Sequence, residues 1–141
     1  MYGLMVFALL FRLVTLMMIH TGVDERDYWN SAKAISQGLE YPELSHRTNR
    51  FAIILPVAAA QLLLGTHPNV YYVLPILNVV LQAALAFLIG FRLKGRLTGF
   101  LASLSLIMFP YMIRAGSQVR PEVFSLTYML LAFLADRKSV V

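Results

Sequence analysis

The chain has 141 residues and a formal net charge of +5, with 59% hydrophobic and only 13% charged residues. Its apolar runs are longer than a soluble domain of this size needs, so the composition predicts an integral membrane protein. The positive charge suits anionic lipid headgroups, whereas nucleic acid would need a soluble basic face that this composition does not offer. The chain contains no cysteine, which excludes disulfides and thiolate metal sites.

Four apolar segments are predicted to span the bilayer. A helix rises about 1.5 Å per residue, so segments of this length approach a hydrocarbon thickness of about 30 Å. The first segment begins at Met1 without a basic leader and lacks a clear cleavage site, which favours a membrane helix over a cleaved signal peptide. Basic residues at positions 92–96 and 137–138 indicate cytoplasmic ends. The predicted spans cover residues 1–20, 70–91, 97–113 and 121–135.

Residues 51–64 are also apolar, but their length does not distinguish a fifth span from a helix at the membrane surface. The distribution of Lys and Arg over the loops favours a crossing, yet long structured loops weigh less in topology than short ones. A crossing would leave the N-terminus outside and residues 21–50 in the cytoplasm, as would suit a regulatory subunit. Charge alone leaves both topologies open.

The loop of residues 21–50 holds five of the seven acidic residues and contains a predicted amphipathic helix. This helix is expected at residues 24–37, with Gly38 as its C-terminal stop and Trp29 suited to the membrane interface. Its apolar face is expected to hold Tyr28, Ala32 and Ile35.

Asp24, at the start of this helix, has two interpretations. The simpler one is an N-cap, a role worth about 1 kcal/mol and far commoner than catalysis. In the other, Asp24, Glu25 and Asp27 crowd together at a bilayer surface, which favours a general base. The residues by themselves do not decide between the two.

An ordered series of short motifs runs through most of the chain. It consists of an acidic pair before an aromatic residue, an Ala-rich helix ending in Gly, an Arg-bearing segment leading into an apolar helix, a basic turn with Gly, a membrane helix ending in Pro, and a Pro-acid pair. The matching stretches are DERDYWNSAKAISQG, RFAIILPVAAAQLLLG, FRLKGRLTGFLASLSLIMFP and RPEVFSLTYMLLAFL. The series resembles the N-terminal third of GT-C membrane glycosyltransferases that use polyprenyl-phosphate sugars. More narrowly, it is similar to the bacterial protein mannosyltransferase and aminoarabinose transferase branch.

The resemblance implies that residues 51–64 form a juxtamembrane helix on the outer face and do not cross. The expected fold is then an all-α integral membrane protein with four transmembrane helices plus an outer-face loop, residues 21–65, that contains two juxtamembrane helices. Residues 1–141 form a single membrane module with both termini in the cytoplasm. Because relatives have further spans and a soluble domain behind this part, the chain is expected to be an N-terminal fragment that is inactive alone.

The resemblance also assigns roles to acidic residues. Asp24 occupies the position of the family's catalytic aspartate, which takes the proton from the acceptor hydroxyl as that hydroxyl attacks the anomeric carbon with inversion. Glu25 completes the acidic pair and either orients Asp24 or binds a divalent cation. Glu122 matches a second acidic residue that faces the same cavity, where relatives more often carry Asp. Directly after Pro121, Glu122 is equally expected as a first-turn carboxylate that stabilises the helix dipole.

A departing phosphate gathers negative charge as the glycosidic bond breaks, so it needs cationic stabilisation. Arg47, Arg50 and Arg120 are predicted to bind the donor phosphate, and Arg114 is available on the same face. Relatives usually have prolines after the arginine that corresponds to Arg50, where this chain has Phe51. The alternative is that these arginines anchor helix ends at lipid headgroups. The three histidines lack metal-ligand spacing, so no metal site is predicted from them.

Polar and small residues inside the predicted spans are interpreted as helix contacts. Arg12 costs about 3 kcal/mol in lipid, so it is expected to face the bundle or snorkel, and the sequence names no partner for it. Asn78 and Gln82 lie four residues apart on one helix face, which suits bonds between helices. A stripe of small residues that would let helices approach comprises Gly95, Gly99 and Ser103.

The predicted function is transfer of a sugar from a polyprenyl-phosphate donor to a hydroxyl of a lipid, glycan or protein acceptor. The reaction is expected at the outer face of a cell membrane, by a multi-pass protein of the bacterial inner-membrane type. The expected partners are the lipid-linked sugar donor and membrane lipids, without nucleic acid. The alternative is a non-catalytic small membrane scaffold or a regulatory subunit, which would keep the bundle without the reaction.

Overall fold

The computed structural model describes residues 2–15, 23–43 and 45–136. These ranges contain seven helices and no strand, which confirms the predicted all-α fold. Part of the first predicted span and the basic pair at positions 137–138 lie outside the described residues. The helices are α1 (Tyr2–Val14), α2 (Val23–Gln37), α3 (Phe51–Leu64), α4 (Val70–Lys94), α5 (Arg96–Met108), α6 (Pro110–Ala115) and α7 (Pro121–Ala135).

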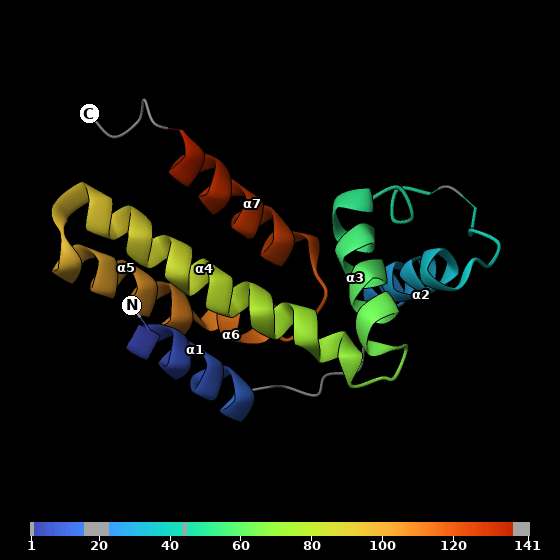
Figure 1. Ribbon diagram of the computed structural model, residues 1–141, viewed down its shortest axis with the longest axis horizontal. Coiled ribbons are helices and arrows are strands. Elements are labelled where there is room, and N and C mark those ends of the chain that lie inside the picture. The colour runs from blue at the N-terminus through green and yellow to red at the C-terminus, as the bar shows by residue number, and fades with distance from the viewer. Residues whose placement is uncertain (1, 16–22, 44, 137–141) are drawn as a thin grey trace.

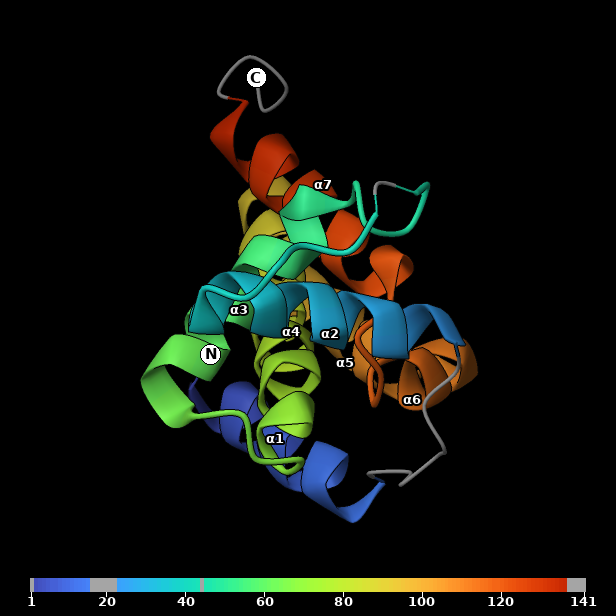
Figure 2. The same cartoon turned by 90° about the vertical axis from the view of Figure 1, so that its right-hand side faces the viewer.

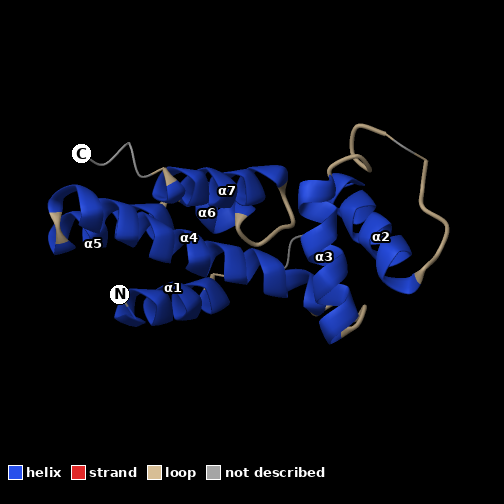
Figure 3. Cartoon of the chain, turned by 45° about the horizontal axis from the view of Figure 1, so that its top comes forward, coloured by secondary structure: helices blue, strands red, loops and turns tan. Residues whose placement is uncertain are grey.

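The helices form a bundle with one covered end. Figure 1 shows α1, α5 and α7 running alongside the long helix α4, while α2 and α3 lie across the end of the bundle where α4 begins. The start of α1, the turn between α4 and α5, and the end of α7 lie toward the opposite end, and Figure 3 gives the same arrangement from another side. Thus α3 crosses the end of the bundle and does not run beside α4 as a fifth parallel helix.

The lengths of the helices bear on the predicted spans. Among the described residues, α4 is the one helix that is long and apolar enough to cross a membrane by length and composition. The other apolar helices, α1, α3, α5 and α7, contain 13, 14, 13 and 15 residues. The span at residues 70–91 therefore corresponds to a helix of sufficient length, while the arrangement with four spans stays a prediction.

The predicted helix at residues 97–113 is wrong in part, because it breaks near its end. Phe109 is extended, with φ −64° and ψ 119°, and Pro110 opens the short helix α6 at its first position. A proline disfavours the helical conformation in the residue before it, which accounts for the break at Phe109. The same ring is well accommodated in the first turn of the new helix, where no donor is needed.

Arg12 is buried inside the bundle, which was one of the two positions expected for it. Its hydrogen-bond partners belong to this chain. Its Nη1 donates to the Ile113 carbonyl at 2.6 Å, and its Nη2 donates to Ser117 Oγ at 2.8 Å. A buried cation is costly unless its donors are satisfied, so these bonds hold α1 against the segment around α6. A partner 101 residues away in sequence could not be named from the sequence.

A polar network joins α4 to α7. Gln82 Nε2 donates to the Val123 carbonyl at 2.6 Å and lies 2.9 Å from Thr127 Oγ1. The Thr127 hydroxyl is in turn 2.9 Å from Asn78 Oδ1. The interpretation of Asn78 and Gln82 as helix contacts is therefore confirmed. Amides and hydroxyls that satisfy one another in this way can be buried between apolar helices at little cost.

Close packing of α4 on α5 depends on Gly90 and Gly99. A Cβ added at Gly99 would lie 2.5 Å from the Phe87 carbonyl oxygen, and one at Gly90 would lie 2.8 Å from the Gly99 Cα. Ser103, one turn further along α5, is fully buried. Gly95 was assigned wrongly to this stripe, because it forms the turn between the helices with φ 87° and has no neighbour within 4 Å of an added Cβ.

We expect Gly99→Ala to destabilise the bundle by about 2 kcal/mol, because the new methyl group meets rigid backbone of α4. The matched control is Gly3→Ala in α1, where an added Cβ meets nothing within 4 Å. Thermal unfolding of the two variants in detergent should show a lower midpoint for Gly99→Ala only. Equal midpoints would show that the glycine contact does not set the helix spacing.

Candidate functional site

The helix α2 carries most of the candidate residues and is fixed on α3. Gly38 ends α2 with φ 64°, as predicted for a C-terminal stop. The predicted apolar face of α2 is partly wrong. Tyr28 and Ala32 are fully buried as expected, but Ile35 is exposed. Ser31 and Ala34 lie on the buried side of the helix in its place. The residues of α2 and α3 that pack in one core cluster are Tyr28, Ala32, Ile53, Ile54, Val57 and Ala58.

Asp24 lies in the first turn of α2, because the helix begins at Val23, so the N-cap interpretation is wrong. A carboxylate in this position still stabilises the positive end of the helix dipole. Arg47 Nε forms an ion pair with Asp24 Oδ1 at 2.7 Å, although the N–H direction does not meet the geometry of a hydrogen bond. Arg47 Nη1 lies 3.2 Å from Asp27 Oδ2. Arg47 therefore draws the loop after α2 back onto the acidic first turn of that helix.

Glu25 is the most buried of the candidate carboxylates. Its side chain is 5% exposed, and its Oε1 accepts a hydrogen bond from Arg120 Nε at 3.0 Å. Arg120 directly precedes α7, so this pair connects the start of α2 with the start of α7. Neither chemical type nor local spacing could have identified a partner 95 residues away.

Arg50 is held by the aromatic ring of Tyr28. Its Nη1 donates to Tyr28 Oη at 2.5 Å, and its guanidinium carbon lies 5.8 Å from the ring centroid. Burial raises the pKa of the Tyr28 phenol, while the charge of Arg50 opposes that rise. The phenol therefore stays neutral near pH 7 and supplies Arg50 with no negative charge.

These groups meet in a cleft of about 420 Å³ at the covered end of the bundle. Figure 2, which looks onto this end, shows α2 lying across it, with the link between α6 and α7 beside the first half of α2. Three segments that are distant in sequence supply the walls of this acid cleft. Its lining residues are Asp24, Glu25, Tyr28, Arg50, Arg120, Pro121 and Glu122.

The acid cleft brings together most, but not all, of the predicted residues. Arg47 does not line it and acts on Asp24 from outside, while Arg114 is exposed on α6 and also lies off the lining. Glu122 lies exposed in the first turn of α7, where the dipole interpretation and a site role are both compatible with its position. Tyr28 was expected only as a packing residue, and its role in holding Arg50 was missed.

The cleft juxtaposes a half-exposed carboxylate, Asp24, with the guanidinium groups of Arg50 and Arg120. Such an arrangement can accept a proton and stabilise an anion at neighbouring positions. Within the described ranges, no group of three or more His, Asp or Glu side chains is arranged to hold a metal ion. The divalent cation considered for Glu25 therefore stays a prediction.

Comparison with models of protein families, with curated proteins and with solved structures finds no match for this chain. The GT-C resemblance therefore rests on the order of the motifs in the sequence.

We expect Arg120→Ala to destabilise the protein by about 2 kcal/mol, because it leaves Glu25 buried and charged without its partner. Adding Glu25→Gln should recover part of this loss, since a neutral amide costs less to bury. Arg47→Ala is the control, because its ion pairs are about one-third to one-half exposed and should contribute less than about 1 kcal/mol. Chemical unfolding of the single and double variants measures these differences, and an equal loss for Arg120→Ala and Arg47→Ala would contradict the assignment.

Proposed function

We propose that this chain is part of an inverting membrane glycosyltransferase of the GT-C type, which transfers a sugar from a polyprenyl-phosphate donor to a hydroxyl acceptor. The observation that carries the proposal is the convergence of Asp24, Arg50, Arg120 and Glu122 on one cleft. These residues come from three stretches that the family resemblance had singled out independently of any structure. Their meeting at one end of the bundle is what a shared active site requires.

A membrane location is supported by the distribution of polar and apolar side chains. Only 44% of the apolar part of α4 is buried, whereas a helix in the core of a soluble protein is mostly buried. Large apolar side chains are exposed around the bundle, including Leu97 at 70% and Met129 at 69%, while Arg12 and Gln82 are buried. A soluble protein avoids apolar surface of this extent, and a bilayer favours it.

The proposed sidedness is supported by the residues at the two ends of the bundle. The basic turn between α4 and α5, with Arg92, Lys94 and Arg96, lies at the end opposite to the acid cleft. Because Lys and Arg accumulate on the cytoplasmic side, this turn is proposed to lie in the cytoplasm and the cleft at the outer face.

In the proposed reaction, Asp24 accepts the proton of the acceptor hydroxyl while that oxygen forms the new bond to the anomeric carbon. The bond from the anomeric carbon to the donor phosphate breaks, and its electron pair leaves with the phosphate oxygen. Arg47 orients Asp24 through the 2.7 Å ion pair. Arg50 is the better partner for the phosphate, because its ligand Tyr28 is neutral, whereas the charge of Arg120 is already matched by Glu25.

A non-catalytic membrane scaffold is the second candidate, and one observation favours it. Asp24 and Glu25 both take part in ion pairs, with Arg47 and Arg120. Ion-pair networks of this kind also serve purely to hold helices together. The two candidates differ in whether neutralising Asp24 affects sugar transfer or only stability.

Sidedness can be tested with single cysteines, because the chain contains none. We expect Glu40→Cys, in the exposed loop after α2, to react with a membrane-impermeant maleimide in intact cells. Lys94→Cys, exposed at the opposite end of the bundle, is the matched control and should react only after the cells are permeabilised. The reverse pattern would place the acid cleft in the cytoplasm and remove the proposed access to the donor.

The catalytic role of Asp24 can be tested by Asp24→Asn in a form of the protein that transfers sugar from a polyprenyl-phosphate donor. We expect the rate to fall at least about a hundredfold, because the amide cannot accept the proton. Asp27→Asn is the control, since Asp27 shares the partner Arg47 but does not line the cleft. Transfer that survives Asp24→Asn as well as it survives Asp27→Asn would reject Asp24 as the base.

A further inference from the structure

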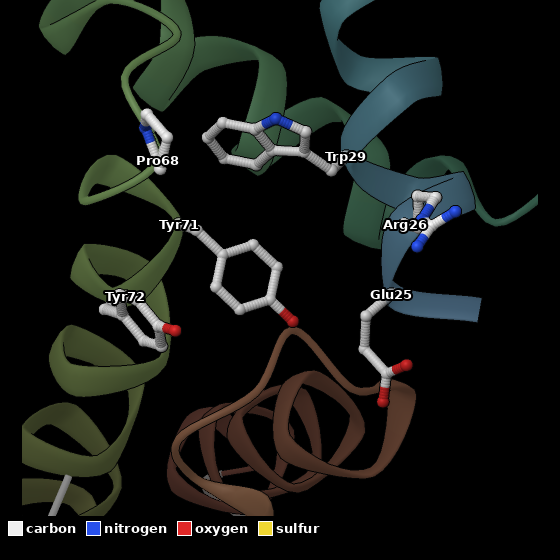
Figure 4. A pocket seen from close by; sticks show the side chains of 6 residues that line it. All are labelled: Glu25, Arg26, Trp29, Pro68, Tyr71 and Tyr72. Carbon is white, nitrogen blue, oxygen red and sulfur yellow. The ribbon is translucent and has the colours of Figure 1, made fainter. Parts of the chain in front are cut away.

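A second cavity, of about 210 Å³, adjoins the acid cleft. It lies between α2 and the beginning of α4, and Glu25 lines both cavities. Figure 4 shows Trp29 and Tyr71 between Tyr72 on one side and the polar pair Glu25 and Arg26 on the other. This aromatic pocket is lined by Glu25, Arg26, Trp29, Pro68, Tyr71 and Tyr72.

The aromatic rings form walls at steep angles to one another. The ring centroids of Trp29 and Tyr71 are 5.7 Å apart with an interplanar angle of 63°, and those of Tyr71 and Tyr72 are 5.3 Å apart at 84°. Tyr71 is fixed, because its Oη accepts a hydrogen bond from the Val119 amide at 3.1 Å. The Trp29 indole packs edge-on against this fixed ring, and the Trp29 backbone carbonyl accepts a hydrogen bond from Gln61 Nε2 at 3.2 Å, which ties this turn of α2 to α3. The aromatic surface is therefore formed before any ligand arrives.

The polar side of the pocket has both donors and acceptors. The Glu25 carboxylate is already paired with Arg120, so the wall carries no uncompensated negative charge. Within the described ranges, the exposed Arg26 guanidinium and the Trp29 indole N–H make no hydrogen bond or ion pair, so both donors remain open to a ligand. A pocket with aromatic faces on one side and hydrogen-bonding groups on the other suits a ligand with the same two faces.

We propose that the aromatic pocket binds one sugar ring of the acceptor, so that the acceptor of the proposed reaction is a carbohydrate or a glycolipid. A pyranose has an apolar face of C–H groups, which stacks on an aromatic ring, and a rim of hydroxyls, which bond to Arg26, Glu25 and the Trp29 N–H. Sites for drug-sized ligands begin at roughly 300 Å³. The aromatic pocket is smaller than that, so its volume suits a single sugar ring. This inference rests on the proposed function, whose acceptor it specifies.

The position of the pocket favours the acceptor over the donor. The donor sugar is bonded directly to phosphate and must lie beside the cation that takes up the phosphate, yet Arg50 does not line the aromatic pocket. A sugar in this pocket would instead adjoin Glu25, at the border of the cleft that holds Asp24. A quaternary ammonium group is the competing ligand for aromatic walls, but it gains most from an unpaired carboxylate and would meet the charge of Arg26.

Binding can be measured directly, because Trp29 is the only tryptophan of the chain. Protein labelled with 5-fluorotryptophan gives one ¹⁹F resonance from inside the pocket. The purified chain should be placed in nanodiscs of phosphatidylglycerol, since maltoside detergents and choline headgroups would both compete for the site. Titration with methyl α-D-mannopyranoside and methyl α-D-glucopyranoside is expected to shift the resonance saturably in the millimolar range for at least one of them.

Two pocket variants and one control make the test specific. Tyr72→Ala removes an aromatic wall, and Arg26→Ala removes an exposed donor with little risk to folding, so each should weaken binding about tenfold. Tyr111→Ala, an exposed tyrosine on α6, should leave the titration unchanged. The inference is overturned by the absence of a saturable shift with both sugars, by a shift that Arg26→Ala does not weaken, or by saturation with tetramethylammonium instead.

The outcome is separable from that of the proposed function, because binding needs no turnover. Saturable sugar binding supports the pocket even where Asp24→Asn leaves transfer unchanged, a result that would reject only the catalytic proposal. Asp24-dependent transfer in a protein that shows no sugar binding would reject only the pocket.

Discussion

The ion pair between Glu25 and Arg120 is the interaction on which the candidate site depends. The helix α2 is fixed on α3 by apolar contacts, but its first turn reaches the start of α7 through this pair. A charged carboxylate that is 5% exposed is costly to bury without a cation close by. The acid cleft has walls from both helices, so its shape follows from that contact. The hydrogen bond from the Val119 amide to Tyr71 fixes the same link between α6 and α7 from the other side.

The bundle beneath the cleft buries several polar side chains within its apolar core and exposes many large apolar ones. In the interior, Arg12 donates to the Ile113 carbonyl and to Ser117 Oγ, and Gln82 and Asn78 bond to Thr127, while many leucine and phenylalanine side chains are exposed on the outside. In the proposed bilayer location no hydrophobic effect would drive the helices together, so close approach and hydrogen bonds would have to hold them. The contact between Gly90 and Gly99 supplies the close approach, and the network between α4 and α7 supplies the bonds. The glycine contact lies near the turn between α4 and α5, and the polar network lies further along α4, so both features hold together the part of the bundle below the cleft.

Local features of the fold could be predicted from the sequence, and distant pairings could not. The stop at Gly38, the extent of α7 and the close contact at Gly99 follow from residue type and spacing, and all three are found. The break at Phe109 was also encoded locally, by Pro110, but the apolar run across it hid the signal. The partners of Arg12 and Glu25 depend on which helices become neighbours, and no periodicity in one chain reports that. The sequence therefore named most of the residues that line the cleft, whereas their pairing, and the bond from Arg50 to Tyr28, required the structure.

The two acidic neighbours Asp24 and Glu25 are held in different ways, and this difference argues for different roles. Glu25 is buried, paired with Arg120, and lines both the acid cleft and the aromatic pocket, so it forms part of the partition between them. Losing the ion pair of that carboxylate would remove the contact that shapes both cavities. Asp24 is 49% exposed, and its partner Arg47 is also bonded to Asp27, so Asp24 can exchange its ion pair for a substrate hydroxyl without disturbing the fold. Of the two, Asp24 is therefore the better candidate for the proposed proton transfer, and Glu25 for holding the wall between the two cavities in place.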